Sequence, residues 1–285
     1  MSNAFETAWS CFSVTLEGRV AHIRLNRPEA YNAMNRAFWN ELPAIVRDID
    51  DNARARAIVI SSTGKHFSAG MDLQNFAGVG EAGARPGDRW VQAEASRHHL
   101  RSLQDTFSCL DEARIPVIAA IQGGCIGGGV DLTSACDIRY ASADAFFCVQ
   151  EINIGMTADA GTFPRLCKLI PQGWVRELAY TGRRMPAAQA LQIGLVNAVL
   201  PDHEAVVAHA LAAAAEIATK APLAVAGSKV MINHAREHGT AASLDYLGAW
   251  QAGMFAGPHM AEAFKAKQEG REPDFPDLVP IHRGM

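Results

Sequence analysis

The sequence predicts an α/β core in its first part, followed by a region made almost entirely of helices. Up to about residue 160, short apolar stretches with strand character alternate with longer segments of helical periodicity. Beyond Gly161 the apolar spacing is helical, and residues 195–200 form the one late strand candidate. We therefore expect a core over residues 1–200 and a helical region with a tail over residues 201–285.

The bulk composition is that of a globular protein and excludes several classes. A chain of 285 residues can bury about 75% of its unfolded surface, which leaves room for a deep active site. The net charge is −4 and no run of Lys and Arg occurs, which argues against nucleic acid as a partner. No apolar run reaches about 18 residues and no charged-then-apolar leader is seen, so we expect neither a membrane span nor secretion.

The six cysteines of the chain predict reduced thiols rather than disulfides or metal ligands. They form no C-x-x-C pair and lie mostly inside apolar segments, which is typical of a cytoplasmic protein. His234 and His238 share a helix face but lack a third ligand. We therefore expect no metal site.

The first elements follow from apolar spacing and one turn signal. Residues 11–16 and 19–25 flank Glu17-Gly18, which predicts a β-hairpin. A helix over about 35–50 has five apolar positions on one face, and a buried strand over 57–61 follows. These five positions are Phe38, Leu42, Ile45, Val46 and Ile49.

The rest of the chain divides at a long glycine-rich stretch over 64–88, whose length is typical of a functional loop. After it the spacing predicts a helix over 89–112 and a strand over 115–121, then a helix that begins at Gly127. Strands near 137–140 and 145–150 precede the helices expected at roughly 161–180, 186–193, 203–219, 222–238, 240–255 and 258–268. Only the last stretch, 269–285, is rich enough in Pro and charge to suggest disorder.

A strand that runs into five glycines within seven residues, from Gly123 to Gly129, is the most informative segment. Glycine lets a ligand approach the backbone, and the first N–H groups of the following helix have no partner within it. Such a helix start favours negative charge. The spacing matches neither the dinucleotide fingerprint nor the P-loop, and a tight packing turn is the alternative interpretation.

A second glycine turn, at residues 65–73, follows the strand over 57–61. Two glycine turns after two strands can supply two N–H donors to one oxygen atom, which is the arrangement of an oxyanion hole. Taken alone, the second turn is equally consistent with an ordinary connection.

Three acidic residues follow these turns. Asp131 lies in a helix of small and apolar residues, Glu151 ends the apolar strand over 146–150, and Asp159 follows with no basic residue between 140 and 164. Carboxyl groups with differently tuned pKa values can abstract and deliver a proton. Each acid taken singly is also consistent with a helix cap or an ion pair.

These residues resemble the crotonase (enoyl-CoA hydratase/isomerase) superfamily over residues 12–268. The likeness rests on two matching segments, with Asn32-Ala33-Met34 after Arg27-Pro28 similar to that family's early motif near the CoA. The two segments are Ser68-Ala69-Gly70-Met71-Asp72-Leu73 and Gly123-Gly124-Cys125-Ile126-Gly127-Gly128-Gly129-Val130-Asp131-Leu132. The resemblance implies an α/β crotonase-like spiral of ββα repeats, with C-terminal helices that assemble the chain into homotrimers, commonly paired to homohexamers.

Within the superfamily, the acids are similar to those of the Δ3,5-Δ2,4-dienoyl-CoA isomerases. Enoyl-CoA hydratases carry Glu at the position of Asp131 and at that of Glu151, and both hold the water that is added. Here the first acid is Asp, and Asp159 is an additional acid near the far end of the acyl chain.

The resemblance also implies a role for each site residue. The N–H groups of Met71 and Gly128 would form the oxyanion hole, Glu151 and Asp159 would transfer protons, and Asp131 would be a third acid lining the site. The substrate would contact Asn32, Ala33, Ala69, Gly70, Met71, Asp72, Leu73 and Gly128. No cofactor or metal is expected, since CoA arrives as part of the substrate.

The implied reaction converts 3,5-dienoyl-CoA into 2,4-dienoyl-CoA, as in fatty acid β-oxidation. A proton leaves C2, a dienolate is held by the oxyanion hole, and a proton is added at C6. The sequence does not assign Glu151 or Asp159 to C2, but one of the two should have a raised pKa. The alternatives are 2-enoyl-CoA hydration, another acyl-CoA reaction of the superfamily and, more remotely, a non-catalytic RNA-binding or scaffold role.

Overall fold

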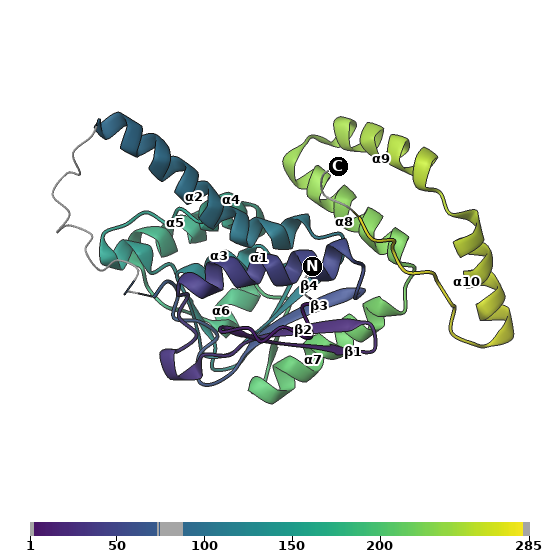
Figure 1. Cartoon of the computed structure of the whole chain (residues 1–285), viewed down its shortest axis with the longest axis horizontal. Coiled ribbons are helices and arrows are strands. Elements are labelled where there is room, and N and C mark those ends of the chain that lie inside the picture. Colours follow the sequence, from purple (N-terminus) through teal and green to yellow (C-terminus); the bar gives the residue numbers. More distant parts are fainter. Residues whose placement is uncertain (1–2, 73, 75–87, 282–285) are drawn as a thin grey trace.

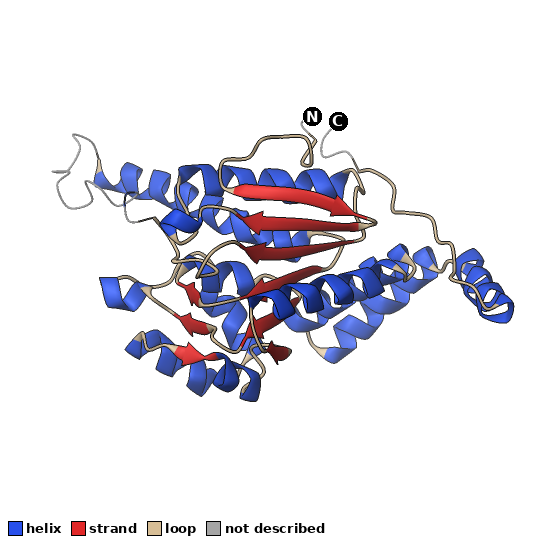
Figure 2. Ribbon diagram, turned by 90° about the horizontal axis from the view of Figure 1, so that it is seen from below, coloured by secondary structure: helices blue, strands red, loops and turns tan. Residues whose placement is uncertain are grey.

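The structure is a computed structural model that describes residues 3–72, 74 and 88–281. Its described strands form a six-stranded sheet in the order β1-β2-β3-β4-β6-β9 and a three-stranded sheet in the order β5-β7-β8. Helices lie on both sides of these strands, and the C-terminal helices extend away from them (Figures 1 and 2). The predicted mixed α/β architecture with a helical C-terminal region is confirmed.

The N-terminal hairpin has the predicted position. β1 (Phe12–Glu17) pairs antiparallel with β2 (Val20–Leu25), and Gly18 takes a positive φ of 59° in the turn. After a short 3-10 helix, η1 (Pro28–Ala30), helix α1 (Arg36–Asp51) begins at Asn35, whose side chain accepts a hydrogen bond from the Phe38 N–H (3.1 Å). All five predicted apolar positions of α1 are buried.

Parallel strands continue the large sheet from β2. They are β3 (Ala57–Ser62), β4 (Val117–Ile121), β6 (Ile138–Ser142) and β9 (Ala198–Leu200). One face of the sheet packs against α1 and α2 (Arg89–Glu112), and the other against α7 (His203–Ala218). Because both faces are covered, β3 and β4 are apolar without alternation.

The small sheet is made of β5 (Gly124–Ile126), β7 (Phe146–Cys148) and β8 (Met185–Pro186). The sequence did not predict β5 or β8, because strands of three and two residues are too short to show a period. The chain passes from β4 in the large sheet to β5 in the small sheet and then into α3 (Gly128–Ser134). This ββα step recurs with β6, β7 and the helices that follow, as the resemblance implied.

Two predicted boundaries were wrong. The helix expected over 161–180 is divided into α4 (Thr162–Leu169) and α5 (Gln172–Thr181). Pro171 causes the break, because its ring prevents the helix from continuing and disfavours helical backbone at the residue before it. The strand expected over 145–150 ends at Cys148, so Glu151 instead begins the 3-10 helix η3 (Glu151–Ile154).

The last helices differ in what they cover. Helix α7, which follows α6 (Ala187–Gln192) and β9, packs on the large sheet. In contrast, α8 (Pro222–Glu237), α9 (Thr240–Met254) and α10 (Gly257–Glu269) reach out from the core (Figure 1). The division of the chain at residue 200 stays a prediction, since α7 shares its core with the strands before it.

The tail after α10 packs on the core over residues 270–281, so the expected disorder was wrong for this part. Phe275 is buried, and the Arg56 side chain donates hydrogen bonds to its carbonyl oxygen and to the Asp277 carboxylate (both 2.6 Å). The Ile281 N–H donates to the Asp51 carbonyl oxygen (2.7 Å). Composition cannot reveal such contacts, because they depend on which distant residues lie opposite the tail.

Candidate active site

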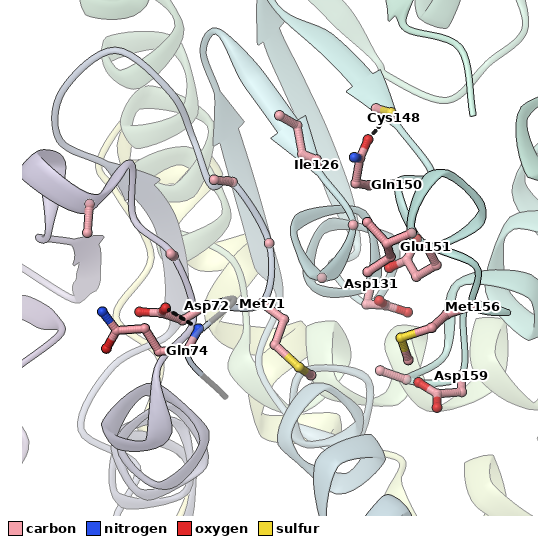
Figure 3. A pocket seen from close by; sticks show the side chains of 18 of the residues that line it. Met71, Asp72, Gln74, Ile126, Asp131, Cys148, Gln150, Glu151, Met156 and Asp159 are labelled. Carbon is pink, nitrogen blue, oxygen red and sulfur yellow. Dashed lines mark hydrogen bonds between the residues drawn. The ribbon is translucent and has the colours of Figure 1, made fainter. Parts of the chain in front are cut away.

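A cavity of about 600 Å³ collects nearly all of the predicted site residues. It lies where the two glycine turns, α3, η3 and the loop before α4 meet (Figure 3). Asn32 does not line it, and Leu73 lies outside the described residues. The predicted residues that line the cavity are Ala33, Ala69, Gly70, Met71, Asp72, Gly128, Asp131, Glu151 and Asp159.

Backbone pairing joins the two glycine turns. The Ser68 N–H donates to the Gly124 carbonyl oxygen, and the Ile126 N–H donates back to the Ser68 carbonyl oxygen (both 3.0 Å). On the other side of the turn over residues 65–73, the Met34 N–H donates to the Gly70 carbonyl oxygen (2.8 Å). These bonds fix the two turns side by side although they are distant in the sequence.

Two amides are left to face the cavity. Gly128 is the first residue of α3, where an N–H has no partner within the helix. The Met71 N–H likewise donates to no other described residue, and it lies 3.8 Å from the point that a Cβ of Gly128 would occupy. These two N–H groups are therefore the candidate donors of the predicted oxyanion hole.

Glycine at position 70 permits this close approach. Its φ is +85°, and a Cβ there would lie 2.7 Å from Ile126 O and 3.3 Å from Gly128 N. Both contacts are with backbone atoms, and these cannot move away without shifting the N–H group of Met71 or that of Gly128. Any other residue at position 70 would disturb the spacing of the amides.

We therefore predict that Gly70→Ala lowers kcat for the expected isomerisation of 3,5-dienoyl-CoA about 10²–10³-fold, the effect typical of losing one oxyanion donor. Steady-state kinetics would measure this loss. Gly194→Ala is the matched control, because Gly194 has nearly the same φ (+82°) and no atom within 4 Å of its added Cβ. Equal activity of the two variants would contradict the prediction.

Asp131 is the most deeply buried of the three acids, with 2% of its surface exposed. Its Oδ1 accepts a hydrogen bond from the Thr162 hydroxyl (2.7 Å). Burial raises the pKa of Asp131 to about 6, although the Thr162 hydrogen bonds and the Arg165 charge oppose this rise. Arg165 itself is ion-paired with Asp111 (2.7 Å), and no described Lys or Arg forms an ion pair with Asp131.

Glu151 lies beside the glycine turn that carries Gly128. Its Oε1 is 3.2 Å from the point that a Cβ of Gly127 would occupy, and its buried Oε2 has no hydrogen-bond partner among the described residues. Burial and, secondly, the negative charge of Asp131 raise the pKa of Glu151 to about 7. The prediction that one acid has a raised pKa is therefore met at Glu151, and a carboxyl group with a pKa near 7 can both take and give a proton.

Asp159 lies at the far end of the cavity, on the loop between η3 and α4. Its carbonyl oxygen accepts a hydrogen bond from the Gln104 side chain of α2 (2.8 Å), while its side chain is exposed. It also lines a second hollow between α1 and α2, together with Trp39, Leu103 and Met156. Figure 3 shows Asp131, Glu151 and Asp159 on one side of the cavity and Met71 on the facing side.

Asn32 was predicted to contact the substrate, but it does not line the cavity. Its side-chain oxygen accepts from the Arg27 N–H (2.9 Å), and its amide nitrogen donates to Thr63 O and His66 O (2.8 and 3.0 Å). The side chain is buried and its polar atoms are all engaged. Asn32 therefore holds the loops together behind the cavity wall rather than facing a ligand.

Sequence reasoning missed three residues of the site. Arg27 and Arg184 bring positive charge to the cavity wall, and the Arg184 guanidinium lies 4.5 Å from the centre of the Phe146 ring. Thr162, the partner of Asp131, lies three residues beyond Asp159. The only hint of Thr162 in the sequence was the absence of basic residues between 140 and 164. No three His, Cys, Asp or Glu side chains are grouped to hold a metal ion within the described residues.

Comparisons with known proteins agree with this geometry. The enoyl-CoA hydratase/isomerase family model matches residues 15–278. The mitochondrial Delta(3,5)-Delta(2,4)-dienoyl-CoA isomerase of Rattus norvegicus is 44% identical over 255 residues, which cover 89% of this chain and 77% of that protein. The peroxisomal enzyme of the same name from Arabidopsis thaliana is 36% identical and covers 92% and 94%. An enoyl-CoA hydratase structure from Bacillus anthracis superposes with a TM-score of 0.83 at 31% identity, covering 93% of this chain and 99% of that one.

Proposed function

The chain belongs to the enoyl-CoA hydratase/isomerase family, and from this premise we propose that it isomerises 3,5-dienoyl-CoA to 2,4-dienoyl-CoA. One observation carries the proposal: three carboxyl groups, one of them Asp159, line the same cavity as Met71 and Gly128, whose N–H groups donate to no other described residue. The dienoyl-CoA isomerases among its relatives support the same reaction.

The geometry supports an assignment of the two proton-transferring acids. A thioester oxygen held by the Met71 and Gly128 N–H groups places C2 near the turn that contains Gly127, and Glu151 Oε1 lies beside that turn. Asp159 lies farther along the cavity, where the second hollow begins. We therefore assign Glu151 to C2 and Asp159 to C6.

The reaction then proceeds in two proton transfers. The ionised Glu151 takes a proton from C2, and the electron pair delocalises onto the thioester oxygen, where the two amides stabilise it. Asp159 passes a proton from water to C6, and the product then has double bonds at C2=C3 and C4=C5. Glu151 ends neutral, and release of its proton to water restores the starting state.

This chemistry needs no further group. One proton is removed and one is added, and no electrons are gained or lost overall, so we propose that CoA enters only as part of the substrate. The positive charges of Arg27 and Arg184 at the cavity wall are suited to the phosphate groups of CoA. Hydration of a 2-enoyl-CoA is less well supported, because Asp131 is bound to Thr162 and is shorter than the glutamate of a hydratase.

We also propose that the chain assembles as a homotrimer, with pairs of trimers forming hexamers. Helices α8–α10 present large apolar side chains to solvent, including Ile232 (68% exposed) and Phe264 (63% exposed). The same helices enclose a hollow of about 620 Å³ that includes Trp250. An apolar surface of this kind is typical of a subunit interface.

A cytoplasmic location stays a proposal, supported by the absence of disulfides among the six cysteines. Two of the relatives are named as mitochondrial and peroxisomal proteins. In the part of the chain that the structure describes, no helix by itself has the length and apolar character to cross a membrane, and only α7 and α8 taken together, bent by 112°, meet those criteria.

The direct test supplies purified enzyme with a 3,5-dienoyl-CoA and, separately, with a 2-enoyl-CoA. We expect rapid formation of the 2,4-dienoyl-CoA, which is measured by its ultraviolet absorbance. Hydration of the 2-enoyl-CoA should be about 10²-fold slower than this isomerisation, the factor typical of lacking one well-placed catalytic group. Strong hydration of the 2-enoyl-CoA without any shift of the diene would contradict the proposal.

A further inference from the structure

The contact between Thr162 and Asp131 joins the start of α4 to the only acid on α3. Both residues are buried, with 0% of Thr162 and 2% of Asp131 exposed. The Thr162 hydroxyl donates to Asp131 Oδ1 (2.7 Å), and the main-chain N–H of Thr162 adds a second favourable interaction with the same carboxyl group. Thr162 is also the first residue of α4, so Asp131 faces the positive end of that helix.

We propose that Thr162 is a positioning residue that keeps Asp131 ionised, and that the Asp131 charge in turn makes Glu151 hold its proton more tightly. The proposal deepens the proposed isomerase function and rests on it. Thr162 itself need not touch the substrate, since it does not line the cavity. It acts through Asp131, which does.

The first step is the cost of an ionised carboxylate in this position. An unpaired charge away from water is strongly disfavoured, whereas hydrogen bonds to the ionised form favour it. Within the part of the chain that the structure describes, Asp131 has no ion pair with a lysine or arginine, and Arg165 is paired with Asp111. The two donors of Thr162 are therefore the main groups that stabilise the Asp131 anion.

The second step leads from Asp131 to Glu151, whose side chains line the same cavity and lie next to each other there (Figure 3). The Asp131 charge is the largest cause, after burial, of the raised pKa of Glu151. Of the other groups facing the pair, the Arg165 charge lowers the pKa of Asp131, and it is not among the causes that shift the pKa of Glu151. Asp159 raises both pKa values, and the Cys125 thiol beside Asp131 has a pKa of about 12 and carries no charge near neutral pH. The Cys148 thiol near Glu151 has a pKa raised by burial.

The two carboxyl groups therefore titrate one after the other, Asp131 at about 6 and Glu151 at about 7. Without the Thr162 hydroxyl, the pKa of Asp131 should rise, because its anion loses a donor. Asp131 then carries less negative charge at a given pH, so the pKa of Glu151 should fall. The pH at which Glu151 becomes an effective base thus depends on a residue outside the cavity.

The test compares two variants. Thr162→Val keeps the shape of the side chain but removes its hydroxyl, whereas Thr162→Ser keeps the hydroxyl. The readout is the pH dependence of kcat/KM for 3,5-dienoyl-CoA. In Thr162→Val, the limb that rises with pH should move to lower pH, so that activity at pH 6, relative to its own plateau, increases about threefold. Thr162→Ser should keep the wild-type profile.

A lower plateau with an unmoved limb would mean that Thr162 only supports the local structure, and it would overturn the proposal. If Thr162→Val does not fold, Asp131→Asn removes the charge directly and should move the limb in the same direction. An unmoved limb in that variant would equally overturn the link from Asp131 to Glu151.

A second readout uses the free enzyme and needs no substrate. Infrared pH titration of the carboxyl C=O band that disappears in Glu151→Gln reports the protonation of Glu151, and this titration should move to lower pH in Thr162→Val. If the band moves but no variant isomerises the diene, the proposed function fails and the link from Thr162 to Glu151 stands. If the variants isomerise the diene but neither the infrared band nor the rising limb of the pH profile moves, the proposed function stands and the link from Thr162 to Glu151 fails.

Discussion

Asp159→Asn should lower kcat for 3,5-dienoyl-CoA isomerisation by about 10²–10⁴-fold, the contribution typical of a positioned acid or base. Asparagine keeps the size of the side chain but cannot deliver a proton to C6. Because Glu151 is untouched, the bound substrate should still exchange its C2 hydrogens with solvent. Incorporation of deuterium at C2 in D₂O, measured beside the rate of isomerisation, would separate the two steps.

The control for this variant is Asp105→Asn, which changes an exposed acid of α2 that lines neither the cavity nor the second hollow. It should keep wild-type activity. Acyl-CoA affinity, measured by calorimetry, should stay the same in both variants, since we propose that the Met71 and Gly128 amides hold the thioester. An Asp159→Asn enzyme that isomerises the diene within a few-fold of wild type would remove Asp159 from the mechanism.

Glu151→Gln should lower the rate of isomerisation by a comparable factor, about 10²–10⁴-fold, and should also stop deuterium exchange at C2. The reason is that Glu151 starts the reaction, so nothing after it can occur. Glu216→Gln, an exposed glutamate of α7, is the matched control. Loss of C2 exchange in Asp159→Asn and its retention in Glu151→Gln would reverse the assignment of the two acids.

The same Glu151→Gln variant should be more stable than wild type above neutral pH. A carboxyl group whose pKa is about 7 in the folded chain, against about 4.3 when unfolded, favours folding at low pH, and this contribution is lost as the pH rises through 7. Glutamine carries no charge at any pH. Thermal unfolding at pH 5 and pH 8 should therefore show a smaller decrease for the variant, and an equal decrease would argue that Glu151 is solvated.

The two effects expected of Glu151→Gln share one origin, which is the burial of a carboxyl group that has few partners. Asp131 and Glu151 are poorly stabilised as anions, and Glu151 has a buried oxygen without a hydrogen bond among the described residues. A site like this sacrifices some stability for reactivity, because the same desolvation that raises the pKa of Glu151 makes it an effective base near neutral pH.

The sequence alone predicted features that depend on neighbouring residues. The hairpin, the buried face of α1 and the bounds of α2 follow from apolar spacing, and both glycine turns are visible as glycines after strands. The break at Pro171 could also have been predicted, since a proline inside a helical pattern usually ends the helix. The strands β5 and β8 could not, because their few residues gain strand structure only by pairing with β7.

The identity of the three acids was likewise readable, but their properties were not. That the amides of Met71 and Gly128 meet depends on hydrogen bonds between Ser68 and the segment after β4. That Asp131 is held by Thr162, and that Asn32 serves the loops rather than the ligand, depends on which side chains lie opposite them. Sequence determines residue types and local conformation, whereas proximity, burial and pKa are set by segments far apart in the chain, and only the tertiary structure brings these together.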